Sequence, residues 1–73
     1  MPNMNVNPSV EQLENIISAY INTVYREVPP TEEEFKEKAD SLRSINANMM
    51  PVTDQEYDEI LRRLKQTLVI QMD

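Results

Sequence analysis

The chain contains no glycine in its 73 residues, and this absence limits its fold more than any other feature of the sequence. Tight β-hairpin turns need residues with positive φ, for which glycine is the usual choice, so an all-β domain is disfavoured. Phosphate-binding loops of the GxGxxG and GxxxxGK types also need glycine and are excluded. Glutamate is abundant, with nine residues, which favours helices.

Prolines divide the chain into three segments with helical periodicity. The apolar stripe of the first segment consists of Val10, Leu13, Ile17, Tyr20, Ile21 and Val24. That of the second consists of Phe35, Ala39, Leu42 and Ile45. That of the third consists of Tyr57, Ile60, Leu61, Leu64 and Leu68. Short connections favour antiparallel neighbours, so we expect an all-α fold, a three-helix up-down-up bundle over residues 8–73, preceded by a flexible tail over residues 1–7.

Each helix is expected to begin with a capping box, a Ser or Thr followed three residues later by Glu or Gln. The pairs with this spacing are Ser9–Gln12, Thr31–Glu34 and Thr53–Glu56. At the first pair, Asn7 and Ser9 are both capping residue types, and Pro8 suits the first helical turn. The three glutamates at 32–34 therefore indicate a helix start, where the helix dipole favours negative charge. They do not indicate a metal site, because successive helical residues diverge by about 100° and their carboxylates cannot converge. Acid–base pairs four residues apart are expected along the surface: Glu32–Lys36, Glu34–Lys38, Asp58–Arg62 and Glu59–Arg63.

The composition argues against most kinds of catalytic and metal-binding site. Cysteine and histidine are both absent, which removes disulfides, thiolate zinc sites and the commonest general base. No serine has a histidine partner, and no acidic residue lies on an apolar stripe. We therefore predict no catalytic residue, no metal ligand and no cofactor. The N-terminal residues lack the pattern of a secretory signal, and no apolar stretch could span a bilayer, so a cytoplasmic location is expected.

Direct binding to nucleic acid is not expected either. The net charge of −6 opposes contact with phosphates. The stretch LRRLKQ carries the only basic concentration and invites a helix-turn-helix interpretation. However, Asp58 and Glu59 would bring acids to the N-terminal end of that helix, the end that approaches base edges. The sign of the charge favours a basic partner instead.

The candidate interface residues are Tyr25, Val69, Ile70 and Met72. Tyr25 lies at the edge of the first stripe. The ending QTLVIQMD allows two structures: the helix stops near Leu68 and an extended apolar tail begins, or it continues and presents a second apolar face. Both imply contact with downstream sequence or with a partner chain, including a second copy. A third possibility, that these residues cover the end of the bundle itself, remains open.

Two runs of sequence resemble a known family. PPTEEEFKEKADSL, then a linker with two methionines and TDQEYDEILRRLKQTLVIQMD, look like the N-terminal helical region of bacterial proteins assigned as endonucleases. These proteins carry the so-called Z-one domain and occur in restriction-modification clusters beside ATPases of the MORC type. The resemblance covers residues 29–73 and implies an N-terminal fragment of a larger enzyme. No nuclease or nucleotide-binding motif occurs in the chain, so the resemblance assigns no catalytic residue.

The expected function is a non-catalytic helical interaction module, the N-terminal domain of such an endonuclease. The alternative is a small independent acidic regulator or adaptor, similar to an antitoxin, that binds a basic partner protein.

Overall fold

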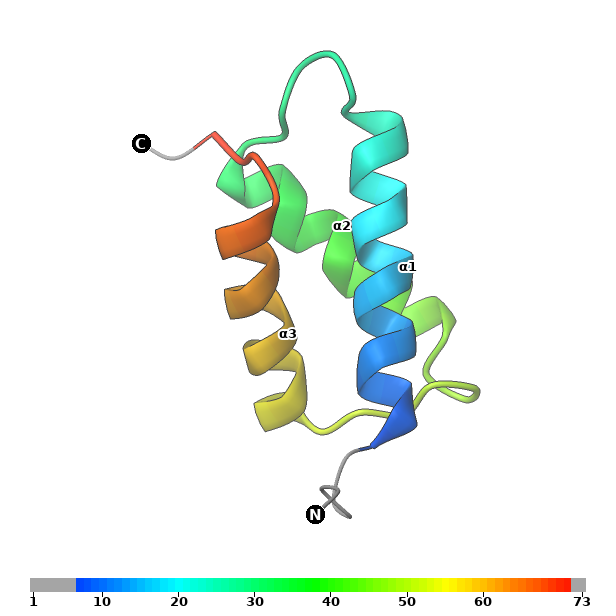
Figure 1. Ribbon diagram of the computed structural model, residues 1–73. Coiled ribbons are helices and arrows are strands. Elements are labelled where there is room, and N and C mark those ends of the chain that lie inside the picture. Colours follow the sequence, from blue (N-terminus) through cyan, green and yellow to red (C-terminus); the bar gives the residue numbers. More distant parts are fainter. Residues whose placement is uncertain (1–6, 72–73) are drawn as a thin grey trace.

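The computed structural model describes residues 7–71 and has the predicted all-α fold, a three-helix up-down-up bundle (Figure 1). The helices are α1 (Pro8–Val24), α2 (Glu32–Ile45) and α3 (Asp54–Thr67). α1 and α3 lie side by side, and α2 crosses behind them in the opposite direction (Figure 1). α1 packs against both of the other helices. None of the three is long and apolar enough to cross a membrane.

The core takes one apolar face from each helix. Its buried members are Leu13, Ile17, Ile21, Phe35, Ala39, Tyr57, Ile60, Leu61 and Leu64. All of them were predicted from the apolar stripes. Two other predicted stripe residues are exposed, namely Val24 (53%) and Ile45 (77%). Each is the last residue of its helix, where the chain turns away to reach the next element.

The two predicted threonine capping boxes are confirmed. Thr31 Oγ1 accepts from the backbone N–H of Glu34 at 3.1 Å, and the Glu34 carboxylate accepts from the backbone N–H of Thr31 at 2.9 Å. Thr53 and Glu56 repeat the arrangement at 3.0 and 2.9 Å. Each box satisfies two backbone donors that a helix start leaves without a partner.

The start of α1 agrees with the prediction only in part, since Asn7 and Pro8 have the expected roles and the capping box does not form. Asn7 is the N-cap, and its Oδ1 accepts from the backbone N–H of Ser9 at 3.0 Å, so the predicted Ser9–Gln12 capping box is wrong. The reason is that Pro8 already occupies the first helical position, which its fixed φ suits. The Asn7 amide also donates to the carbonyl of Pro51 at 3.1 Å, which ties this helix start to the α2–α3 connection. Residues 1–6 of the predicted tail lie outside the described residues.

The predicted surface pairs are replaced by others. Lys36 pairs with Asp40, and Arg62 pairs with Glu59. The predicted Glu34–Lys38 pair does not form, because the Glu34 carboxylate is held by the capping box. Arg63 pairs with Glu14 and Lys65 pairs with Glu32, each on another helix. Such pairs form because the packing of two helices can bring a carboxylate closer to a basic side chain than any carboxylate of its own helix.

The end of α3 follows the first of the two structures expected for QTLVIQMD. The helix stops at Thr67, and Leu68 is already extended (φ −94°, ψ 153°). Residues 68–71, here called the clip, return beside the start of α2 (Figure 1). α1 also ends before the two prolines that divide the first segment from the second, Pro29 and Pro30, and residues 25–31 arch over the end of the bundle.

Candidate functional site

The clip is bonded to the connection between α1 and α2. The backbone N–H of Gln71 donates to the carbonyl of Pro30 at 2.8 Å, and Thr31 and Gln71 form an isolated parallel β-bridge. The side-chain amide of Gln71 donates to the carbonyl of Pro29. Nearby, Lys65 of α3 pairs with Glu32 of α2 at 3.0 Å. These contacts bring segments from both halves of the sequence to one end of the bundle.

An open groove of about 300 Å³ lies at this end. It is lined by Ile21, Asn22, Tyr25, Arg26, Glu27, Pro29 and Val69. Two of the predicted interface residues, Tyr25 and Val69, therefore meet in one hollow although they are far apart in the sequence. The groove joins apolar walls to one basic and one acidic side chain. Val69 is 75% exposed, and Val28, next to the lining residue Pro29, is 65% exposed.

The other predicted interface residues have different positions. Ile70 is partly buried and packs against the core, so it covers the end of the bundle, as the third possibility described. Tyr25 is also partly buried against the core, while it lines the groove. Met72 lies outside the described residues. The sequence did not point to Ile21 or Pro29 as groove residues, because the path of the α1–α2 connection decides their position.

A second, polar hollow of about 590 Å³ also borders the clip. Its lining consists of Thr31, Glu32, Glu33, Lys36, Lys65 and Gln71. Most of these charges are already compensated, since Glu32 pairs with Lys65 and Lys36 pairs with Asp40. Within residues 7–71, no group of three or more acidic side chains is placed to hold a metal ion.

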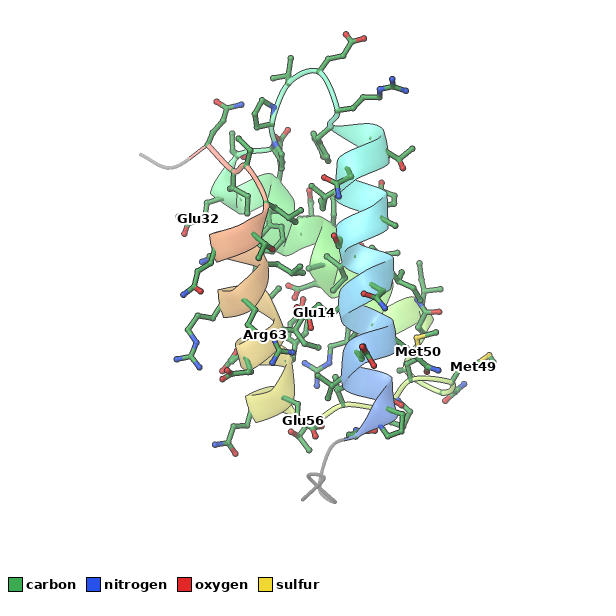
Figure 2. All side chains as sticks on the ribbon, in the orientation of Figure 1. Glu14, Glu32, Met49, Met50, Glu56 and Arg63 are labelled. Carbon is green, nitrogen blue, oxygen red and sulfur yellow. The ribbon has the colours of Figure 1, made fainter. Side chains whose placement is uncertain are left out.

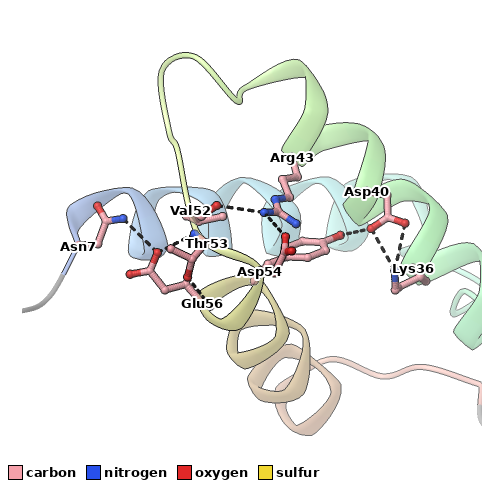
Figure 3. Close-up of polar contacts among 9 residues, drawn as sticks. Asn7, Lys36, Asp40, Arg43, Val52, Thr53, Asp54 and Glu56 are labelled. Atoms are coloured by element: carbon pink, nitrogen blue, oxygen red, sulfur yellow. Dashed lines mark hydrogen bonds and ion pairs between the residues drawn. The ribbon is translucent and has the colours of Figure 1, made fainter.

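A polar cluster joins α2 to the start of α3 (Figure 3). The buried Tyr57 donates its hydroxyl hydrogen to Asp40 at 2.5 Å. Arg43 stacks over the Tyr57 ring at 4.5 Å from its centre and also binds Asp54 at 2.9 Å. The Tyr57 hydrogen bond is the main reason that the pKa of Asp40 is lowered, with Lys36 adding to it. Burial, followed by the bond to Asp40, raises the pKa of Tyr57, which therefore remains a donor.

This cluster contains one confirmed prediction and several residues that the sequence did not single out. Tyr57 was expected on the apolar stripe of the third helix, and it is buried there with its hydroxyl bonded to the exposed Asp40. Asp40 and Arg43 were not identified, because their partners lie on another helix. Every charge in the cluster has a partner, so the arrangement suits a structural contact between helices.

The basic stretch of α3 is also neutralised within the fold. Arg63 reaches across to Glu14 of α1 at 2.7 Å, and the two side chains point toward one another between the helices (Figure 2). Arg62 pairs with Glu59, and Lys65 pairs with Glu32. All three cations of LRRLKQ thus have acidic partners, an arrangement that does not favour contact with phosphates.

No protein-family model, no curated protein and no solved structure matches this chain.

Proposed function

We propose that this chain is a non-catalytic helical module that binds another protein through the groove at Tyr25 and Val69. The observation that carries the proposal is this groove, in which apolar walls from α1 and the clip meet beside exposed valines. Apolar side chains gathered around a hollow are typical of surfaces that bind partners. The groove also places Arg26 and Glu27 at its wall, which supplies polar groups for orientation.

The charges of the chain support a basic partner. Five of its seven Lys and Arg residues are engaged in ion pairs with its own acids. Among the described residues, the acids without an ion pair or a capping role are Glu11, Glu27, Glu33, Glu37 and Asp58. Only Arg26 and Lys38 remain to balance them. The surface therefore carries an excess of negative charge, while Glu27 and Arg26 both line the groove.

Two biological settings fit such a module. In the first, implied by the resemblance of residues 29–73 to the Z-one-domain family, the module is the N-terminal domain of a larger bacterial endonuclease and binds other parts of that protein. In the second, it is an independent acidic regulator or adaptor that binds a separate basic protein. The uncompensated acids favour a basic surface in either setting.

The proposal is tested with the isotope-labelled chain and a short synthetic peptide of lysine and leucine. We expect saturable NMR shifts centred on Tyr25, Pro29 and Val69, at peptide concentrations below about 1 mM. A peptide in which glutamate replaces lysine should bind far more weakly, because it meets like charge. Diffuse shifts without saturation, or equal binding of both peptides, would contradict the proposal.

A pair of variants distinguishes peptide binding at the groove from nonspecific binding to exposed apolar side chains. Val69→Ser changes a groove residue that is 75% exposed, and Met49→Ser changes a residue that is 79% exposed. Met49 lies near the opposite end of the bundle (Figure 2). The first substitution should weaken binding of the lysine–leucine peptide several-fold, and the second should leave it unchanged. Equal losses would show that the peptide does not recognise the groove.

A further inference from the structure

The side chains of the clip alternate between the core and the solvent. Leu68 and Ile70 are partly buried and pack against the core, whereas Val69 and Gln71 are exposed. Such alternation is the pattern of an extended strand with one buried face. Val69 is therefore held at the groove by its neighbours in the clip and not by burial of its own side chain.

The clip is attached partly to a groove residue, because the carbonyl of Pro29 accepts from the Gln71 side-chain amide, and partly to residues outside the groove lining. Ile70 packs on the core, and the backbone N–H of Gln71 donates to Pro30. Neither Ile70 nor Gln71 lines the groove, yet both fix the position of Val69, which does. The lining residues Ile21 and Tyr25 belong to the end of α1, and their backbone does not depend on the clip.

We propose that the clip, residues 68–71, is a movable wall that assembles the binding groove: the groove is complete only while Ile70 and Gln71 are docked. This inference rests on the proposed function, because it concerns how the same site is formed. A short extended segment held by few bonds belongs to the parts of a fold that open most easily. Docking of the clip and binding of a basic partner are then coupled.

The coupling is reciprocal. If an undocked clip weakens the binding of a partner by some factor, then the bound partner must favour the docked clip by the same factor. Binding should therefore slow hydrogen exchange of the Gln71 amide, whose hydrogen is bonded to Pro30. The Gln71 amide is 2.8 Å from that carbonyl oxygen and does not belong to the groove lining, so it reports on the clip and not on direct contact with the peptide.

The test uses Gln71→Pro in the full chain, because proline removes both the backbone donor to Pro30 and the side-chain donor to Pro29 while the buried side chains remain unchanged. Ile70→Ser is a second variant that releases the clip through its packing. Val69→Ser is the matched control, since it alters the groove wall and should leave the clip docked. The readouts are the NMR signals of the Tyr25 ring, hydrogen exchange of the amides of residues 68–70, which every variant retains, and titration with the lysine–leucine peptide.

We expect both releasing variants to shift the Tyr25 ring signals without peptide, and to weaken peptide binding by about fivefold or more, within the usual range of coupling between sites. The inference is overturned if either variant frees the clip and still binds the peptide as the native chain does, a result that leaves the proposed function intact. If the native chain does not bind the peptide, the proposed function fails. The NMR signals of the Tyr25 ring then test the movable wall without the peptide. Unchanged ring signals in both releasing variants overturn it, and shifted ring signals support it.

Discussion

Replacing Tyr57 by phenylalanine tests whether the contact between α2 and α3 depends on one hydrogen bond. The substitution removes the hydroxyl that donates to Asp40 at 2.5 Å and keeps the ring in the core. It also keeps the face over which Arg43 stacks at 4.5 Å. The expected loss of stability therefore reports the hydrogen bond and little else.

The size of the loss can be worked from the exposure of the acceptor. Hydrogen bonds to charged groups contribute about 1.5–3 kcal/mol. The Asp40 side chain is 51% exposed, and water competes for its oxygens, so the lower end of that range applies. We expect Tyr57→Phe to lower the free energy of unfolding by about 1.5 kcal/mol, which for a domain of this size lowers the melting temperature by about 6–12 °C.

A double-mutant cycle isolates the contact. Urea unfolding followed by circular dichroism is measured for the native chain, Tyr57→Phe, Asp40→Ala and the double variant. The cycle removes the loss of the Lys36–Asp40 pair, which both Asp40 variants share. We expect a coupling energy of about 1–1.5 kcal/mol. A coupling below about 0.3 kcal/mol, the level at which independent sites add, would refute the reasoning.

The same contact predicts a pH dependence. The Tyr57 hydrogen bond, with Lys36 in support, lowers the pKa of Asp40 from its ordinary value of 3.8. A carboxyl with a lowered native-state pKa stabilises the fold above 3.8, and its contribution is lost as the pH falls through the native-state pKa. The coupling energy should therefore be constant near neutral pH and disappear in acid below 3.8. In Tyr57→Phe, NMR titration should place the Asp40 pKa closer to 3.8 than in the native chain.

Thr53→Ala should destabilise the chain by about 0.5–2 kcal/mol in thermal unfolding, because it removes a capping bond at the start of α3. Glu33→Gln should change stability by less than about 0.5 kcal/mol, as is usual for an exposed site. Tight divalent-metal binding that this variant abolished in calorimetry would contradict the helix-start interpretation of the three glutamates. The chain should not shift duplex DNA at micromolar concentration and physiological salt. Salt-dependent binding that disappears in the double variant Arg62→Ala, Arg63→Ala would restore the helix-turn-helix alternative.

Helix positions and core faces followed from the sequence because both depend on local rules. Thr31 and Thr53 cap their helices as the spacing of their glutamates predicted. The apolar stripes became the core because helical periodicity alone decides which side chains share a face. The exceptions, Val24 and Ile45, lie at helix ends, where periodicity does not say how far the neighbouring helix extends.

Charge pairing did not follow from the sequence in the same way. Glu59 was assigned to Arg63 by spacing, yet Arg63 binds Glu14 on another helix and Glu59 binds Arg62. Exposed pairs within a helix contribute only about 0.2–0.5 kcal/mol, so a carboxylate across a helix interface competes readily. The relative position of the helices must be known before such partners can be identified.

The candidate interface residues show both what the sequence could predict and what it could not. Val69 and Ile70 were both predicted as interface residues, and the backbone after Leu68 was left open between an extended tail and a continued helix. Residues 67–70 include three β-branched side chains, Thr67, Val69 and Ile70, which favour extended backbone. At a period of two, Leu68 and Ile70 share one face and Val69 the other, which is the division that the structure has. The sequence therefore contained a signal for the exposed side chain of Val69. It contained none for the meeting of Val69 with Tyr25, which depends on how the α1–α2 connection bends and where the clip is bonded to it.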